Sequence, residues 1–227
     1  VMKIGFYNKL IIDRLTKVGL FLTDGKKDVL LPLKYIPKKY EIGDEINVFV
    51  YLDHEERPVA TTLKPYITVG NFAYLSVNYI NKFGAFLNWG LEKDLFVPFK
   101  EQARPMEEKK RYLVFAYIDE KTNRIVASSR ISRFLNNENL EIEIGEEVDL
   151  IVSHITELGI NVIINNKHSG LIYKSDVYEE LKTGQKIKGF IKTIREDNKI
   201  DVVLQKQGFE NIASFAEIIL SELKANK

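Results

Sequence analysis

The chain has 227 residues, a formal net charge of +1, 45% hydrophobic residues and no cysteine. The lack of cysteine excludes disulfides and thiolate metal sites and is compatible with the reducing cytoplasm, where we expect the protein to reside. Apolar runs such as Val162-Ile163-Ile164 are far too short to span a bilayer, and no secretory signal is visible near the N-terminus, so we expect no membrane association.

The sequence repeats itself about three times, and in each copy a glycine-containing strand precedes three further strand-like segments. The segments of the three copies are, in chain order, 18–22, 29–32, 46–53 and 58–63; 83–87, 95–98, 112–119 and 124–129; and 158–162, 170–173, 187–195 and 199–204. Gly19, Gly84 and Gly159 occupy equivalent positions, where we expect a bend between two sheet faces. A repeat of this length predicts a chain of small domains rather than a solenoid.

The segments are rich in β-branched and aromatic residues, as in 46–52, 112–118 and 148–152, and turn residues separate them. They predict a mainly β protein with three small barrels. Because units of this size bury little surface, we expect neighbouring barrels to support one another. The predicted boundaries of the barrels are 1–64, 65–135 and 136–207.

The last segment, 208–227, has a different pattern. Between Ser214 and Leu223 the apolar residues fall on one stripe of a predicted helix, and Glu217 follows Ser214 at the spacing of a capping box. We therefore expect the third barrel to be followed by a C-terminal helix.

The near-neutral total charge hides an asymmetry among the three predicted units. Residues 1–64 carry 11 basic and 9 acidic side chains, residues 65–135 carry 11 and 7, and residues 136–207 carry 9 and 13. The middle unit is therefore the electropositive one, and its small excess of basic side chains predicts moderate anion binding.

Two of the copies carry motifs that resemble the S1 RNA-binding domain, which is an oligonucleotide-binding-fold barrel. In the second copy these are residues 83–87, Asp119 and residues 124–130, and in the third copy residues 170–176 and 181–189. Three such modules in tandem resemble the conserved virulence factor B family of bacterial RNA-binding proteins. That resemblance implies a C-terminal winged-helix domain, of which the predicted C-terminal helix would be the first element.

The resemblance implies binding of single-stranded RNA by base stacking and phosphate contacts. In the family, the aromatic residues that flank the glycine form the stacking platform, and here they map to Phe83 and Phe86. Arg111, Arg124 and Arg130 are the neighbouring candidates for phosphate contacts. The structural alternative is that the two rings belong to the barrel core and that the arginines are solvated surface residues.

The copies are not equivalent at these positions. The third copy has Asn161 where the second platform aromatic belongs, and the first copy has Val18 in place of the first, so we expect the first unit to be the weakest binder or a structural unit. Units two and three, with the cleft between them, are the predicted site. The candidate residues in the third unit are Tyr173, Lys188, Lys192 and Arg195.

No pattern in the sequence is typical of an enzyme. His54, His154 and His168 lie in different units without metal-ligand spacing, and neither a phosphate-binding glycine loop nor a serine nucleophile elbow is present. We therefore predict a non-catalytic single-stranded RNA-binding protein without metal or cofactor, acting as a post-transcriptional or virulence-related regulator. The alternatives are a scaffold that docks ribosomal or transcription-machinery proteins, a binder of single-stranded DNA, and an accessory subunit of an RNA-processing complex.

Overall fold

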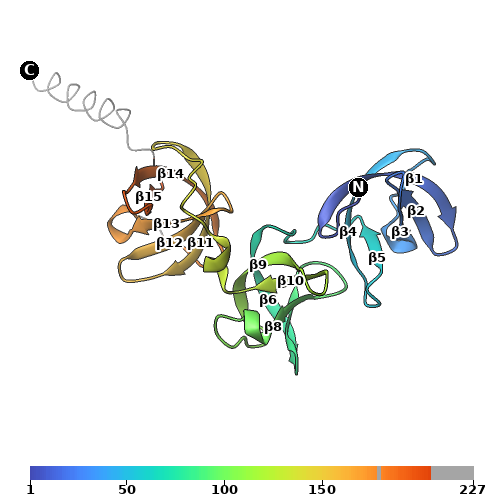
Figure 1. The fold of residues 1–227 in the computed structure, drawn as a ribbon, viewed down its shortest axis with the longest axis horizontal. Coiled ribbons are helices and arrows are strands. Elements are labelled where there is room, and N and C mark those ends of the chain that lie inside the picture. Colours follow the sequence, from blue (N-terminus) through green and yellow to red (C-terminus); the bar gives the residue numbers. More distant parts are fainter. Residues whose placement is uncertain (178–179, 206–227) are drawn as a thin grey trace, which may run out of the picture. The chain divides into compact units, whose positions relative to one another are not determined.

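The computed structural model describes residues 1–177 and 180–205, and these residues form three closed barrels of five strands each (Figure 1). In every barrel the strands are arranged in the order first, second, third, fifth, fourth, and the fourth strand pairs back with the first. The third and fifth strands run parallel, whereas all other neighbours are antiparallel. The prediction of a mainly β protein with three barrels is confirmed, and the predicted C-terminal helix lies outside the described residues.

Barrel 1 is built by residues whose apolar side chains alternate between the interior and the surface. In its first strand, Leu10 and Ile12 are buried while Ile11 between them is exposed, as the two-residue period of a strand requires. The elements of barrel 1 are β1 (Phe6–Thr16), β2 (Gly19–Thr23), β3 (Asp28–Pro32), η1 (Leu33–Tyr35), β4 (Glu45–Leu52) and β5 (Pro58–Thr61).

Barrels 2 and 3 repeat this arrangement, including a short 3-10 turn after the third strand. The elements of barrel 2 are β6 (Phe72–Asn81), β7 (Gly84–Asn88), β8 (Leu95–Pro98), η2 (Phe99–Glu101), β9 (Arg111–Asp119), β10 (Arg124–Ser128) and η3 (Ile131–Phe134). The elements of barrel 3 are β11 (Glu147–Ile155), β12 (Gly159–Ile164), β13 (His168–Tyr173), η4 (Lys174–Asp176), β14 (Lys186–Ile194) and β15 (Ile200–Val203). No helix in the described part of the chain is both long and apolar enough to cross a membrane.

The first strand of each barrel contains a bulge directly after a buried residue, namely Ile12, Val77 and Val152. The register shifts there leave Asp13, Asn78 and Ser153 without a partner on the second strand. The repeated glycine has a separate role: at Gly84 a Cβ atom would lie 2.3 Å from the carbonyl oxygen of Val97. The register shift thus lies in the first strand, before the glycine. The glycine itself begins the second strand and permits the close approach of the third strand.

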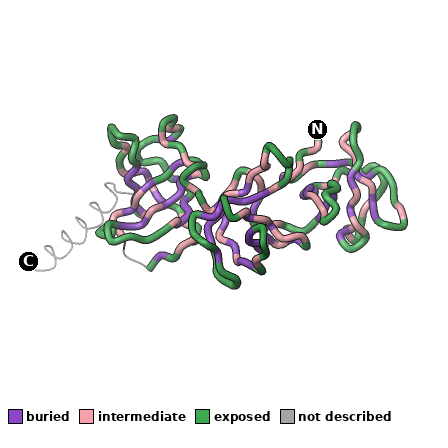
Figure 2. Tube along the Cα trace, turned by 60° about the horizontal axis from the view of Figure 1, so that its bottom comes forward, coloured by how far each residue is buried: buried purple, intermediate pink, exposed green. Residues whose placement is uncertain are grey.

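Barrels 1 and 2 form one compact unit, Val1–Phe134, and barrel 3 belongs to a second unit that begins at Leu135. Barrel 1 has a core of its own, whereas the core of barrel 2 extends to residues of barrel 1, and Figure 2 shows the buried stretches of the chain. Phe49 and Tyr51 of β4 pack edge-on against Trp89 of barrel 2, with ring centroids 5.8 and 6.2 Å apart. The expected mutual support of neighbouring barrels is confirmed for this pair.

Candidate functional site

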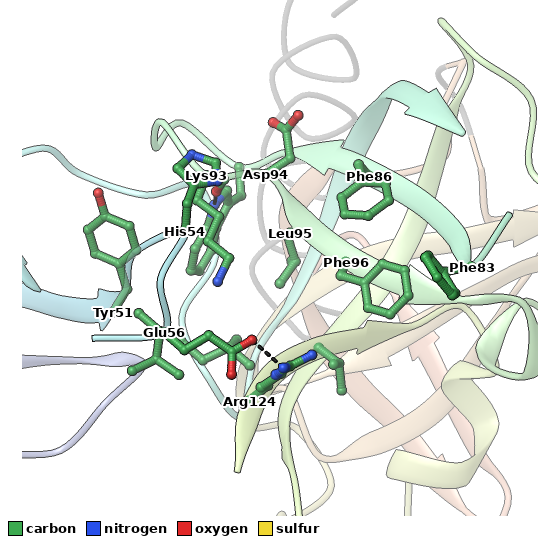
Figure 3. Close-up of a pocket in the computed structure, with 14 residues that line it drawn as sticks. Tyr51, His54, Glu56, Phe83, Phe86, Lys93, Asp94, Leu95, Phe96 and Arg124 are labelled. Carbon is green, nitrogen blue, oxygen red and sulfur yellow. Dashed lines mark hydrogen bonds and ion pairs between the residues drawn. The ribbon is translucent and has the colours of Figure 1, made fainter. Parts of the chain in front are cut away.

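A pocket of about 480 Å³ lies between barrels 1 and 2, within the first compact unit (Figure 3). Its volume falls in the range of roughly 300–1,000 Å³ that is usual for ligand sites. Barrel 1 contributes the end of β4 and the loop that follows it, and barrel 2 contributes β7, β8, β10 and neighbouring turns. The lining residues used below are Glu56 of barrel 1 and Phe83, Phe86, Lys93, Phe96 and Arg124 of barrel 2.

Three aromatic residues, which we call the aromatic row, stand side by side on the outer face of barrel 2. They are Tyr79 of β6, Phe86 of β7 and Phe96 of β8, and each pairs with the next across the strands. The rings of Tyr79 and Phe86 are stacked with centroids 4.5 Å apart, and those of Phe86 and Phe96 are tilted at 4.9 Å. Phe86 and Phe96 are half-buried, whereas 44% of Tyr79 is exposed, so the row forms an apolar surface open to solvent.

The bulge in β6 explains why Tyr79 belongs to this row. Ala73, Leu75 and Val77 face the barrel interior, so strict alternation would also place Tyr79 inside. The extra residue Asn78 reverses the alternation and turns Tyr79 outward, opposite Phe86. The amide of Asn78 donates a hydrogen bond of 2.8 Å to Asp94 Oδ1, which ties the bulge to the pocket.

Phe83 lies in the turn between β6 and β7 and extends the apolar surface at the edge of the pocket. Its side chain is the most accessible of the lining rings, because 62% of the residue is exposed. The backbone N–H of Phe83 donates to Asn81 Oδ1 at 2.8 Å, which fixes the turn that presents it. Neither Phe83 nor Phe86 belongs to the hydrophobic core, so both rings face outward as a stacking platform would require.

Charged side chains lie across the pocket from these rings (Figure 3). Arg124, at the start of β10, forms an ion pair with Glu56 in the loop between β4 and β5. Lys93 Nζ donates to the carbonyl oxygen of Asp53 at 2.8 Å. Burial lowers the pKa of Lys93 from its ordinary value, and the positive charge of Arg124 acts in the same direction. The pocket is therefore lined by two cations and two carboxylates, of which Asp94 accepts from Asn78 and Glu56 lies against Arg124.

The other two arginine candidates of barrel 2 lie outside the lining of this pocket. Arg111 Nη2 donates to the carbonyl oxygen of Tyr74 at 2.7 Å, and its guanidinium lies 4.8 Å from the centre of the Tyr74 ring. Arg130 Nε donates to the carbonyl oxygen of Lys100 at 2.9 Å. The predicted grouping of Arg111, Arg124 and Arg130 beside the two phenylalanines is thus found for Arg124.

The candidates in barrel 3 are engaged with one another or with carboxylates. Arg195 donates to both carboxylate oxygens of Asp201 and to the hydroxyl of Tyr173, and these bonds raise its pKa. Lys192 pairs with Asp176 at 2.9 Å. Lys188 pairs with Asp149 at 2.8 Å and with Glu147 at 3.7 Å, and the hydrogen bond to Asp149 raises its pKa.

The positions equivalent to the aromatic row hold different residues in the other two barrels. In barrel 1 the guanidinium of Arg14 lies 4.4 Å from the centre of the Phe21 ring and covers one face of it. Three aromatic rings in a row are therefore a feature of barrel 2. The equivalent residues are Arg14, Phe21 and Leu30 in barrel 1, and His154, Asn161 and Leu171 in barrel 3.

Sequence reasoning missed four residues of this site, namely Tyr79, Phe96, Lys93 and Glu56. The predicted site in units two and three, with the cleft between them, stays a prediction, and the pocket described here lies between barrels 1 and 2. A bulge decides the orientation of Tyr79, and the packing of barrel 1 on barrel 2 brings Glu56 to Arg124. The residues next to Tyr79 and Glu56 in the sequence therefore do not indicate that these two side chains belong to the site. Among residues 1–177 and 180–205, no group of three or more histidine and carboxylate side chains could hold a metal ion.

Comparison with known proteins agrees with this architecture. The family model described as the S1 domain matches residues 4–63 and 69–129, which together make up more than half of the chain. The "Uncharacterized protein YitL" of Bacillus subtilis (strain 168) is 28% identical over 98% of this chain and 77% of that protein. The predicted resemblance to bacterial proteins with tandem S1 domains, such as the conserved virulence factor B family, is confirmed.

A solved structure shares the fold over nearly the whole chain. It is a crystal structure of a "multidomain protein with nucleic acid binding domains" from Streptococcus pneumoniae TIGR4. The two chains are 20% identical with a TM-score of 0.50, and the match covers 98% of this chain and 81% of the other. At this identity the likeness shows the fold alone.

Proposed function

Because the chain belongs to the S1 domain family, whose barrels bind nucleic acid, we propose that it binds single-stranded RNA at the pocket between barrels 1 and 2 and catalyses no reaction itself. The observation that carries this proposal is the aromatic row of barrel 2, which continues through Phe83 to the edge of a pocket that also holds Arg124. An apolar aromatic surface beside a cation is the combination that single-stranded nucleic acid requires.

Stacking supplies the part of the affinity that does not depend on sequence. Every base has a π-face, and stacking it on an aromatic side chain contributes about 1–3 kcal/mol per base. Phe83 and Tyr79 present the most exposed rings and are the proposed platforms, while Phe86 stacks against Tyr79 and packs against Phe96.

Arg124 is the proposed phosphate contact in this site. In the structure its partner is the carboxylate of Glu56, and both side chains are about half exposed. An ion pair of this kind is worth little in water, so a phosphate can replace the carboxylate at small cost. Contacts to phosphate position the strand without reading its sequence.

We propose a smaller contribution from barrel 3. Its candidate cations Lys188, Lys192 and Arg195 already have carboxylate partners, and residues 136–207 carry 13 acidic against 9 basic side chains. Tyr173 is held by Arg195 in the same network. Barrel 3 then extends the RNA path or docks a ribosomal or transcription-machinery protein, and barrel 1 acts mainly as a wall of the pocket.

The wider role in this proposal is a cytoplasmic post-transcriptional or virulence-related regulator. It is supported by the resemblance to the conserved virulence factor B family and by the lack of cysteine. The preference for RNA over DNA is supported by the same resemblance.

The proposal is tested by fluorescence anisotropy with labelled RNA and DNA homopolymers of nine nucleotides at two salt concentrations. We expect RNA to bind more tightly than DNA of the same sequence, and the logarithm of the affinity to fall with the logarithm of salt by about 0.7 for each phosphate contacted. Absence of RNA binding at low salt would contradict the proposal. Tighter binding of DNA would assign the site to single-stranded DNA, and loss of intact RNA during incubation with magnesium would indicate a nuclease.

A further inference from the structure

The charged end of the pocket combines an acceptor with donors in a small space. The carboxylate of Glu56 lies against the guanidinium of Arg124, and the ammonium of Lys93 lies at the same end (Figure 3). Aromatic rings form the opposite wall. A flat ligand that stacks on those rings would therefore turn its polar edge toward a carboxylate and a cation.

Guanine has the base edge that fits this arrangement best. Its Watson–Crick edge presents two adjacent donors, N1–H and the N2 amino group, next to the acceptor O6, and proteins read such edges on unstacked bases of single strands. A carboxylate accepts from two donors at once, and a lysine donates to a carbonyl oxygen. Adenine and cytosine each offer a single donor group on this edge, and uracil offers one N–H between two acceptors.

We propose that the pocket receives one unstacked guanine of a bound RNA, with Glu56 accepting from N1–H and N2 and Lys93 donating to O6. This inference rests on the proposed function, because it adds a base preference to the same site. Barrel 1, which lacks an aromatic row, then supplies the residue that reads the base, while barrel 2 supplies the stacking surface.

The backbone conformation of Glu56 supports a role for its side chain. Glu56 has φ +64°, in the left-handed region that glycine and asparagine tolerate best. The corresponding hairpin loops of barrels 2 and 3 hold asparagine at this conformation, namely Asn123 with φ +54° and Asn198 with φ +58°. Barrel 1 therefore carries a glutamate where its sister barrels carry the better-suited residue, and such strain is typical of functional positions.

Binding of a phosphate and binding of the base are coupled through Arg124. In the structure the carboxylate of Glu56 pairs with the guanidinium of Arg124. When a phosphate takes the guanidinium, the carboxylate of Glu56 is released, and guanine offers it two donors. Because 43% of the Glu56 side chain is exposed, water can hydrate the released carboxylate, so the bonds to guanine add a modest affinity beyond the phosphate contact.

The test compares labelled RNA nonamers of uridine that carry a central guanosine, adenosine or cytidine, or uridine throughout, using the full chain. We expect the guanosine oligonucleotide to bind about 10-fold more tightly than the others. Glu56→Gln should abolish this preference and, by freeing Arg124, leave binding of the all-uridine strand equal or tighter. Glu55→Gln is the matched control, because Glu55 is the neighbouring exposed carboxylate, pairs with Arg57 and does not line the pocket.

The binding results separate the guanine inference from the proposed RNA binding. Equal binding of the four strands, or a preference that Glu56→Gln leaves intact, would overturn the guanine inference while RNA binding itself would still support the proposed function. Absence of binding to any strand would overturn both. Because a guanine base can also come from a free nucleotide, GMP is titrated with the fluorescence of Trp89, the single tryptophan, which lines the pocket. Tighter binding of GMP than of the guanosine oligonucleotide would overturn the assignment to RNA.

A second variant keeps the test independent of folding. Glu56→Asn places in barrel 1 the residue that barrels 2 and 3 use at this conformation. It should therefore fold at least as well as the parent protein and still lose the guanine preference. Retention of the preference by Glu56→Asn would contradict the role of the carboxylate.

Discussion

Phe83 and Phe86 both face outward from barrel 2, but their surroundings give them different roles. Phe86 is enclosed between Tyr79 and Phe96, so its removal would disturb two neighbouring rings. Phe83 is 62% exposed and stands at the edge of the pocket. Phe83 is therefore the residue at which RNA binding and stability can be separated.

Phe83→Ala should weaken RNA binding by the contribution of one stacked base, about 5- to 150-fold, with little change in thermal stability. The matched control is Leu158→Ala, because Leu158 occupies the equivalent turn of barrel 3 and is also 62% exposed. Fluorescence anisotropy and thermal unfolding of both variants provide the comparison. An equal loss of affinity in the two variants would argue against a platform in barrel 2.

Arg124→Gln should change the salt dependence of RNA binding as well as its strength. Removal of one phosphate contact lowers the slope of log affinity against log salt by about 0.7. Arg111→Gln is the control, because Arg111 lies outside the pocket lining and contacts Tyr74. If Arg111→Gln reduced the slope and Arg124→Gln did not, the phosphate path would run over another face of barrel 2.

At the level of the strands, the threefold repeat in the sequence was enough to predict the barrels and most of their strands. The predicted segments 112–119 and 46–53 correspond to β9 (Arg111–Asp119) and β4 (Glu45–Leu52) within one residue at each end. The bulges could not be counted from the sequence, because an extra residue in a strand depends on the pairing with its neighbour. The bulge in β6 decides whether the side chain of Tyr79 lies in the core or on the surface, so the sequence could not show that Tyr79 belongs to the aromatic row.

The close approach at Gly84 gives a prediction about the second strand of the barrel. Gly84→Ala would place a Cβ atom 2.3 Å from the oxygen of Val97, so the strands must separate. Gly25→Ala is the control, since Gly25 has φ +84° but nothing within 4 Å of the added atom. We expect Gly25→Ala to cost about 1–2 kcal/mol and Gly84→Ala about 1–3 kcal/mol more, measured by urea unfolding. Equal losses would mean that the clash relaxes freely.

At the scale of the whole molecule, barrels 1 and 2 form one compact unit because the core of barrel 2 extends to Phe49, Tyr51 and Val59 of barrel 1. Phe49 of β4 is fully buried against Trp89 of barrel 2. Backbone contacts add to this, since the N–H of Val69 donates to the carbonyl oxygen of Gly5 at 3.0 Å. The pocket exists only where these barrels meet, so the site depends on the integrity of both.

Cooperative unfolding of the two barrels can be measured with Trp89, the single tryptophan, as the reporter in barrel 2. Leu22 is fully buried in the separate interior of barrel 1, and Leu22→Ala should cost about 2–5 kcal/mol. If the barrels unfold together, this change lowers the urea midpoint that Trp89 reports, while Ile42→Ala at an exposed position of barrel 1 leaves it unchanged. An unaltered midpoint in Leu22→Ala would show that the barrels unfold independently.

The most direct test of RNA binding in the pocket is photocrosslinking with oligouridylate that carries 5-iodouridine, which reacts with aromatic side chains that stack on it. Mass spectrometry then identifies the crosslinked residues. The account predicts crosslinks at Tyr79 and Phe83 of barrel 2, competed by unlabelled RNA. Crosslinks confined to residues 136–205, with barrel 2 unmodified, would contradict it.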